Sequence, residues 1–270
     1  MTNEITKKVQ TSAASILKQL VEIFEQNNLK YIMCFGSLLG AVRHNGFIPW
    51  DDDVDISMPR EDFERFRTIA KDILPENLFF QDYTTDSQYP STIAKIRDCN
   101  TTMIENGYRK LKEMNHGIFV DIFVADYYAP SKMNEMRKKI LNINKSILLS
   151  QKVCVCGKLK QTVARMIPRN FLFKRTEKML KKMDKSGKKE FFFIDCCKTP
   201  LNSNIFEDTV LTKFEDFEVR IPKDYDFILT EIYGNYMELP PEDRRRPIHT
   251  TEHISCDIPF AEYIKTHKEL

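Results

Sequence analysis

The spacing of apolar residues at the start of the chain predicts a helix, a short strand and a helical turn. Apolar side chains recur between Val9 and Gln26 with the period of a helix that has one buried face. Two consecutive asparagines end that helix before the apolar stretch LKYIMCF, which is typical of a short strand. Gly36 then permits a tight exit, and SLLGAVRH reads as a helical turn capped by Ser37.

Apolar and polar residues alternate from Asp53 to Met58, which predicts a half-buried strand. Asp53 and Asp55 fall on its polar face, whereas Asp52 points to the other side by the same alternation. A helix from Arg60 to Ile73 is expected next. The pattern therefore places two carboxylates side by side on one surface of a sheet.

Later stretches predict further strands and helices. TIAKIRD and TTMIE look like strands paired around Asp98 to Asn100, and GIFVDIFVADYY is an apolar strand that carries Asp121. FFFIDC and FEDFEVRIP are also expected to be strands, YDFILTEIYGNY a helix, and MELPPEDRRRP a proline-rich loop. We therefore predict the α/β (α+β) class, with one domain over residues 1–270 built on a mixed sheet flanked by helices.

Composition agrees with a folded, intracellular protein. Hydrophobic residues make up 42% of the chain and charged residues 30%. Apolar runs such as Phe191 to Ile194 are too short to cross a bilayer, and the N-terminus has no apolar signal segment, so we expect a cytoplasmic protein. The seven cysteines include no CxxC pair, which favours reduced thiols. Zinc is left open for Cys154, Cys156, Cys196 and Cys197, although CxC and CC are unusual ligand spacings.

Charge is distributed unevenly along the chain. Between Ser131 and Glu190 there are 18 Lys or Arg against four acidic residues, a local charge of 18 − 4 = +14, so the remainder carries 2 − 14 = −12. We interpret residues 131–190 as a basic helical insertion, broken near Gly157 and Pro168, that either contacts an anionic surface or stays solvated. Its apolar residues would form a membrane-facing stripe or pack on the rest of the protein: Ile140, Leu141, Ile147, Leu148 and Leu149.

Four aspartates occupy five positions, and such a cluster is costly unless a cation offsets its charge. They are Asp51, Asp52, Asp53 and Asp55. With Asp121 on a later strand, Asp53 and Asp55 suggest carboxylates that hold two divalent cations, most simply Mg²⁺, with Mn²⁺ as an alternative. The alternation argues against a solvated acidic turn. An EF-hand calcium loop fails because isoleucine occupies the position that requires glycine.

Basic residues for a phosphate are available nearby. Lys95 and Arg97 are two positions apart on a predicted strand, so they point the same way, and a guanidinium can grip a phosphate with two hydrogen bonds. Arg43 follows the turn at Gly36 and Ser37, whose free N–H groups form an anion site. Surface ion pairs are the alternative role for each of these basic residues.

The aromatic residue nearest the aspartates is Trp50, the only tryptophan. Its expected role is packing over the aspartate strand, with stacking on a base or a quaternary ammonium as the alternative. His44 and His116 flank the aspartate strands in sequence, but a lone histidine is more often a hydrogen-bonded bystander than a base. Neither is assigned a catalytic role.

The stretch GSLLGAVRHNGFIPWDDDVDISMPREDFERF resembles the LicD family of phosphocholine transferases. That family is related to fukutin and fukutin-related protein within the nucleotidyltransferase fold superfamily. The resemblance continues in AKIRDCNTT, FVDIFVAD and YGNYMELPPEDRR, so it touches most of the chain outside the basic segment.

The resemblance implies a phosphotransferase that moves a phospho-alcohol, typically phosphocholine, from a CDP-alcohol to a hydroxyl of a glycan such as lipopolysaccharide or teichoic acid. It implies Asp53 and Asp55 as paired metal ligands, Asp121 as the third and Asp51 as a supporting residue. The acceptor would be lipid-linked at the inner membrane face in some members, and no nucleic acid is expected. A nucleotidyltransferase and an inactive binding protein are the alternatives. The chain departs from similar proteins at RRRPIHTTEH, which leaves His249 and His253 without an expected role.

Overall fold

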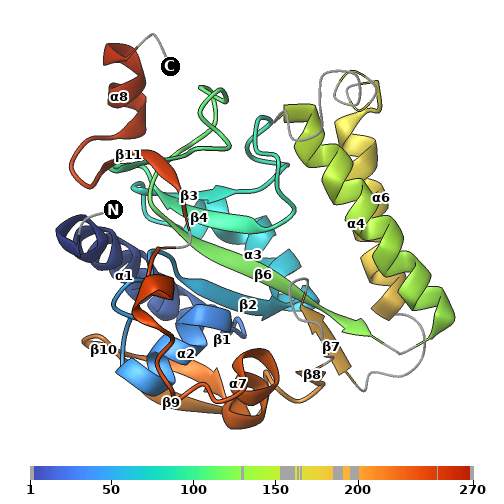
Figure 1. The fold of residues 1–270 in the computed structure, drawn as a ribbon. Coiled ribbons are helices and arrows are strands. Elements are labelled where there is room, and N and C mark those ends of the chain that lie inside the picture. Colours follow the sequence, from blue (N-terminus) through green and yellow to red (C-terminus); the bar gives the residue numbers. More distant parts are fainter. Residues whose placement is uncertain are drawn as a thin grey trace.

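A mixed β-sheet runs through the centre of the computed structural model (Figure 1). The structure describes residues 3–128, 131–152, 162, 164, 166–184, 191–194, 201–247 and 249–267. In these residues the sheet has seven strands. In spatial order they are β1 (Ile32–Met33), β2 (Asp55–Pro59), β6 (Phe119–Tyr128), β4 (Ala94–Asp98) and β3 (Leu78–Gln81), with β7 (Phe191–Ile194) and β8 (Leu201–Asn202) continuing from the far half of β6.

The long strand β6 organises this sheet. It runs parallel to β2 and antiparallel to β4 and β7, which confirms a mixed sheet. Its first half pairs with β4 and its second half with β7, so one edge of β6 serves two neighbours. Because β2 and β6 are parallel, residues that start the two strands lie at the same end of the sheet.

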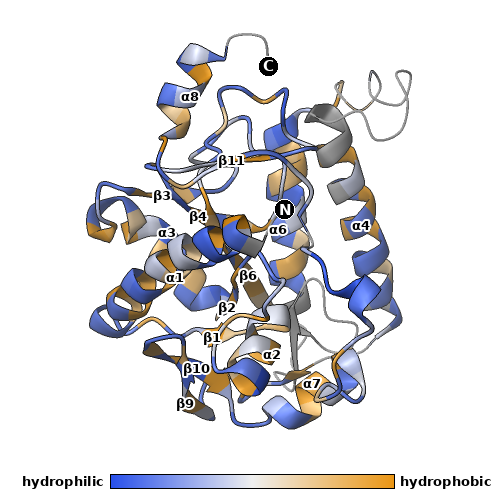
Figure 2. Ribbon diagram, turned by 60° about the vertical axis from the view of Figure 1, so that its left-hand side comes forward, coloured by the Kyte–Doolittle hydropathy of each residue, from blue (hydrophilic) through white to orange (hydrophobic). Residues whose placement is uncertain are grey.

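Helices pack around the sheet as the apolar spacing predicts, and in Figure 2 α1, α3 and α6 carry both hydrophilic and hydrophobic residues along their length. α1 (Asn3–Gln26) starts earlier than expected, and α3 (Arg60–Ile73) has the predicted bounds. The buried face of α1 is fully shielded from solvent and consists of Val9, Ala13, Ile16, Leu17, Leu20 and Phe24. Each of these side chains other than Ala13 contributes about 1.5–3 kcal/mol through burial, so these contacts hold α1 on the sheet.

The helix that leads into the aspartates begins two residues before the predicted cap. α2 (Phe35–His44) has Cys34 at its N-cap position, with no side-chain capping bond. Ser37 lies inside the helix, and its Oγ accepts a hydrogen bond from the N–H of Asp55 at 2.8 Å. The expectation of a Ser37 cap is therefore wrong, because this hydroxyl is used to join α2 to the start of β2.

The two strands predicted to pair around Asp98 do not pair with each other. β4 has both edges occupied, by β3 and β6. β5 (Thr102–Glu105) therefore leaves the main sheet and pairs with β11 (Thr251–Ser255) near the end of the chain, beside α8 (Phe260–Thr266). This pairing ties the C-terminal segment to the sheet on the β4 side.

A hairpin replaces the single strand that was expected for FEDFEVRIP. β9 (Thr209–Phe214) and β10 (Phe217–Pro222) pair across a tight turn in which Glu215 adopts a φ of 55°. α7 (Tyr225–Tyr233) follows as predicted, and the proline-rich loop contains the short 3₁₀ helix η1 (Glu242–Arg244). α2 packs against both β9 and α7.

The basic segment forms two helices that pack together beside the sheet (Figure 1). They are α4 (Lys132–Lys152) and α6 (Arg169–Asp184), the latter starting directly after Pro168 as predicted. Leu141 contacts α6 residues, and Leu148 packs with Leu172 and Phe173. These leucines thus face protein, which is one of the two alternatives considered for the apolar stripe.

Two expectations concern parts of the chain that the structure does not describe. Gly157, expected to break the basic helices, and the four cysteines considered for zinc lie outside the described residues. Among the described helices, no stretch combines the length and the apolar character that a bilayer span requires.

Candidate functional site

A row of charged residues crosses three neighbouring strands. Asp55 on β2 is paired in register with Asp121 on β6, and Asp121 with Lys95 on β4. Residues in register on adjacent strands point to the same face of a sheet, so these three side chains meet. The Nζ of Lys95 lies 2.7 Å from Oδ1 of Asp121. The predicted convergence of Asp55 and Asp121 is therefore present in the fold.

Asp53 joins this row from the segment just before β2. Asp53, Asp55 and Asp121 each offer a carboxylate oxygen, and these atoms lie within 4.8 Å of one another. All three residues are less than 10% exposed. Carboxylates that converge in this way form the donor set that hard divalent cations prefer.

The turn between α2 and β2 brings a further carboxylate against this group. The carbonyl of Asp51 accepts a hydrogen bond from Gln10 on α1 at 2.8 Å, and its N–H donates to Ile48. A Cβ at Gly36 would lie 2.8 Å from Oδ2 of Asp51, closer than real Cβ contacts allow. Glycine is therefore needed at position 36 because the Asp51 carboxylate approaches the first turn of α2.

Burial and mutual repulsion make these carboxylates reluctant to ionise. Burial and the neighbouring Asp53 and Asp52 raise the pKa of Asp51 to about 8. Burial is also the main reason why the pKa of Asp53 rises to about 6, against the lowering effect of His249. The pKa of Asp55 is raised well above its usual value by burial, Asp53 and Asp121. A bound cation would favour the ionised forms.

The carboxylate of Asp55 provides the test of whether a cation fits. It is 9% exposed, and within the described part of the chain its oxygens have no hydrogen-bond or ion-pair partner. A buried carboxylate without a partner is costly, and its position toward Asp53 and Asp121 suits a positively charged ligand. The residues present fit a divalent metal.

Lys95 and Arg97 point to the same side of β4, as predicted, and both lie over the ring of Phe119. Their surroundings differ. Lys95 contacts Asp121, whereas Arg97 is fully buried and donates to Gln81 Oε1 at 2.6 Å and to the carbonyl of Gly117 at 2.7 Å. The structure thus brings Lys95 into the site and places the Arg97 guanidinium in the interior beside it.

Arg43 and Trp50 make their described contacts with other parts of the chain. Arg43 donates to the carbonyl of Tyr236 at 2.5 Å, and so ties the last turn of α2 to the loop after α7. Trp50 packs on the hydrophobic core, with His44 against one edge and Arg245 over its ring. This packing is the role that was expected for Trp50.

His249 is a site residue that sequence reasoning missed. Its Nδ1 lies 3.3 Å from Oδ1 of Asp52 and 3.6 Å from Oδ2 of Asp53. Burial lowers its pKa, but the hydrogen bond to Asp52 and the charge of Asp53 outweigh that effect and raise the pKa to about 9. The sequence feature that could have identified His249 is its position directly after the proline-rich loop.

Asp52 is buried beside the other carboxylates, and its exposed fraction is only 2%. The predicted alternation does not apply to it, because β2 begins at Asp55 and the preceding residues turn irregularly. The other histidines lie elsewhere. His116 is buried with its Nε2 against the carbonyl of Leu111, and His253 stacks on Tyr263 of α8.

Comparison with known proteins finds a family model that matches part of the chain and relatives of similar sequence. Residues 28–147 match the LicD/FKTN/FKRP nucleotidyltransferase domain. The chain is similar to the lipopolysaccharide cholinephosphotransferase LicD of Haemophilus influenzae, with 29% identity over 262 residues that cover 91% of this chain and 96% of the relative. It is also similar to an uncharacterized protein of Rickettsia prowazekii, with 36% identity over 125 residues that cover 46% of this chain and 42% of the relative.

Proposed function

Because the chain carries a LicD-family nucleotidyltransferase domain at residues 28–147, we propose that it is a phosphotransferase. It moves a phospho-alcohol group, most simply phosphocholine, from a CDP-alcohol to a hydroxyl of a cell-surface glycan or its precursor. The similarity to a lipopolysaccharide cholinephosphotransferase supports this class of substrate. The single observation that carries the proposal is the convergence of Asp53, Asp55 and Asp121 beside Lys95.

Asp53, Asp55 and Asp121 would hold Mg²⁺, with Mn²⁺ as the alternative. When bound, such ions neutralise the charge of phosphate oxygens and lower the pKa of an attacking hydroxyl. Hard carboxylate oxygens with little competition from protein hydrogen bonds suit this role. The unpartnered carboxylate of Asp55 is the observation of this chain that supports the assignment.

Side chains of the site then act on the acceptor hydroxyl and on the donor phosphates. The acceptor hydroxyl attacks the phosphorus that bears the alcohol, and its proton passes to an aspartate of the group. A new bond forms between the acceptor oxygen and phosphorus as the bond to the bridging oxygen breaks, so CMP leaves with the electron pair. Lys95 supplies a positive charge for that developing phosphate, and Arg97 supports the Phe119 ring beneath Lys95.

The N-terminal turn of α2 would bind the phosphates of the CDP-alcohol donor. Its backbone N–H groups at Gly36 and Ser37 belong to a helix start, where an anion is favoured by the helix dipole. Gly36 leaves the room next to Asp51 that a larger residue would fill. We therefore assign these two residues to the donor phosphates, and we assign Arg43 to holding the α7 loop over the end of α2.

The test is to incubate the purified chain and Mg²⁺ with CDP-choline, CDP-ribitol or CDP-glycerol, together with lipopolysaccharide or teichoic acid acceptors. We expect CMP release with one donor, dependent on metal and absent in Asp55→Asn. Pyrophosphate release from CTP and a phospho-alcohol would instead support a nucleotidyltransferase. No turnover with either donor class, despite intact folding, would support an inactive binding protein.

We propose in addition that the α4–α6 pair contacts an anionic membrane surface that presents the acceptor. Exposed cations occur along α6 at Lys174, Arg175, Lys178 and Lys182, with the exposed ring of Phe171 near its start. Each basic residue near an anionic bilayer contributes on the order of 1 kcal/mol. The protein would thus act in the cytoplasm at the inner face of the membrane.

A further inference from the structure

Asp53 belongs to two different groups of metal-ligating atoms. One is the group with Asp55 and Asp121 described above. The other consists of Asp52, Asp53 and His249, whose ligand atoms also lie within 4.8 Å of one another. A carboxylate has two oxygens, and one residue shared by two such groups is the arrangement of a bridging ligand in a two-metal site.

The distances from His249 to the other two residues are close to those between ligands of one ion. Nδ1 of His249 lies 3.3 Å from Asp52 and 3.6 Å from Asp53. Two ligands at about 2.1 Å from a divalent ion are separated by about 3.0 Å in octahedral geometry and about 3.4 Å in tetrahedral geometry. Little rearrangement is therefore needed for one ion to contact all three residues.

The fold holds His249 in place from several sides. Its backbone N–H lies 3.4 Å from Oδ1 of Asp52, and its ring meets the edge of Phe119 with centroids 5.4 Å apart. Arg245, just before it, donates to the carbonyl of Pro240 and lies over Trp50. A ligand whose ring is fixed in this way loses little conformational entropy when it binds metal.

We propose that His249, Asp52 and the shared Asp53 form a second cation position, adjacent to the position made by Asp53, Asp55 and Asp121. The second position differs from the first in having an imidazole ligand. Imidazole nitrogen favours Mn²⁺ or Zn²⁺ over Mg²⁺, so the two positions take different metals when both are offered. The inference deepens the proposed metal site, but it requires no particular CDP-alcohol and no turnover.

The experiment is a Mn²⁺ titration of the purified, metal-free chain followed by electron paramagnetic resonance. Free Mn²⁺ is counted from its solution signal, and nitrogen coordination is detected from hyperfine coupling to bound Mn²⁺. We expect two Mn²⁺ ions per chain and coupling to an imidazole nitrogen in the wild type. Growth with ¹⁵N-histidine should change that coupling, which tests the nitrogen ligand without any substitution.

Variants then identify which histidine is bound. His249→Gln should lose the nitrogen coupling and weaken Mn²⁺ binding at one position by at least about tenfold, while the other position is retained. Asp52→Asn should weaken the same position. His253→Gln is the matched control, since His253 stacks on Tyr263 and pairs in β11 with β5. Circular dichroism confirms that each variant is folded.

Two results would overturn the inference. One is a wild-type Mn²⁺ signal that shows no coupling to histidine nitrogen, because His249 would then be only an ion-pair partner of Asp52 and Asp53. The other is an unchanged Mn²⁺ count and affinity in folded His249→Gln. Neither result depends on catalysis, so failure to find a CDP-alcohol substrate leaves this test intact.

Discussion

Asp55 combines burial, like-charged neighbours and the lack of a partner among the described residues. Asp55→Asn would remove a proposed metal ligand and would also remove charge repulsion. We expect CMP release to fall by at least about 100-fold, as for loss of a group that stabilises transition-state charge. Without metal, the variant should melt a few degrees higher than wild type, because about 1 kcal/mol corresponds to about 2–4 °C in a chain of this size.

Thermal melts of both proteins with and without Mg²⁺ check this prediction. Wild type should gain stability with Mg²⁺, and Asp55→Asn should gain much less, because ligand binding stabilises only the folded state. Asp216→Asn is the control, since Asp216 is an exposed aspartate that pairs with Lys18 far along the chain. Equal Mg²⁺ stabilisation of wild type and Asp55→Asn would remove Asp55 from the metal ligands.

Substitution of Arg97 can distinguish a structural role of this residue from a role in phosphate binding. Arg97→Lys keeps the charge but cannot reach Gln81 and Gly117 with the same planar fork. Each buried acceptor left unsatisfied costs about 1–3 kcal/mol, so urea denaturation should show a clear loss of stability. At a temperature where the variant is folded, KM for the donor should stay near the wild-type value. A higher donor KM at unchanged stability would show that Arg97 binds phosphate instead.

His116 provides a stability change with pH. Burial and the charge of Arg97 lower its pKa to about 4, from an ordinary value of 6.5. Between pH 6.5 and 4 the unfolded chain therefore binds a proton that the folded chain does not, so this contribution is present above pH 6.5 and is lost as pH falls. Each pKa unit corresponds to about 1.4 kcal/mol.

Urea denaturation of wild type and His116→Gln across this pH range measures the effect. We expect the stability of the variant to fall less steeply with decreasing pH than that of wild type, whatever its absolute stability. Parallel curves would mean that His116 is protonated equally in both states, contrary to its burial at 1% exposure.

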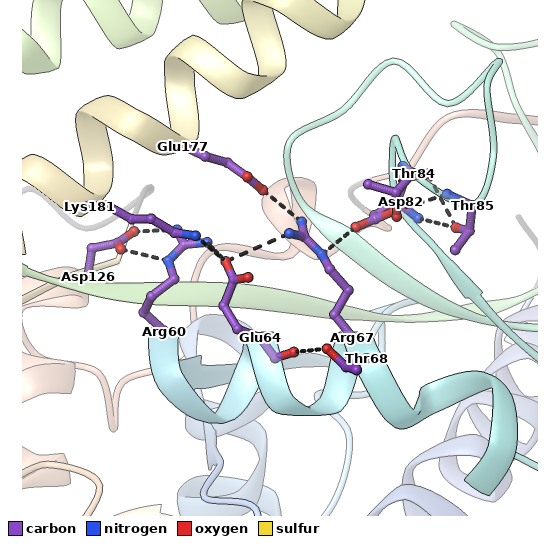
Figure 3. Close-up of polar contacts among 10 residues, drawn as sticks. All are labelled: Arg60, Glu64, Arg67, Thr68, Asp82, Thr84, Thr85, Asp126, Glu177 and Lys181. Atoms are coloured by element: carbon purple, nitrogen blue, oxygen red, sulfur yellow. Dashed lines mark hydrogen bonds and ion pairs between the residues drawn. The ribbon is translucent and has the colours of Figure 1, made fainter.

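At the scale of the elements, ion pairs join α6 to α3 (Figure 3). Arg67 on α3 lies between Asp82 and Glu177, with 2.8 Å to each carboxylate. Arg60 makes a two-pronged contact with Asp126 on β6. Glu177 of α6 is thereby joined to α3, next to the apolar contact in which Phe173 of α6 stacks on Tyr83.

Arg67→Met should destabilise the protein strongly. Asp82 is buried, and removal of one partner of a buried ion pair costs about 3–5 kcal/mol. Lys181→Met is the matched control, because Lys181 also joins α6 to α3 through Glu64 but is 47% exposed, and exposed pairs contribute only about 0–1 kcal/mol. Urea denaturation compares the two, and similar losses of stability would show that the Arg67 contacts are not dominant.

At the scale of the whole molecule, the helices of the proposed membrane contact lie apart from the carboxylate site. The carboxylate site lies at the start of β2 and β6, whereas α4 and α6 lie beside the other half of the sheet (Figure 1). The exposed side chains of Ile143 and Phe171 accompany the cations on these helices. Leu141 and Leu148 are buried, so these two side chains do not contribute to such a surface.

Sedimentation with anionic vesicles at low and high salt tests this contact. We expect binding at low salt that weakens at high salt, and a further loss when Lys174, Lys178 and Lys182 are changed to Glu, since exposed charges are screened by salt. The variant should keep its CMP release with a soluble acceptor. No binding of wild type at low salt would exclude the membrane contact and leave the catalytic proposal untouched.

The local periodicity of apolar residues was sufficient to predict the main elements at the centre of the site. The helix from Arg60 to Ile73 and the apolar strand around Asp121 were predicted, because a short stretch displays its own period. The half-buried strand expected from Asp53 to Met58 instead starts at Asp55 and is buried on both faces. The grouping of Asp55 and Asp121 followed from their places on two strands, whereas Asp53 joins them from the segment before β2.

Contacts between residues far apart in the sequence decided the remaining features of the site and the fold. His249 lies 197 positions from Asp52, and β5 pairs with the C-terminal β11 because neighbouring strands already cover both edges of β4. Arg97 is surrounded by groups 16 and 20 positions away, so its two-residue spacing from Lys95 indicated its direction but not its partners. Periodicity along the chain determines which face a residue occupies, whereas only the folded chain determines what lies opposite that face.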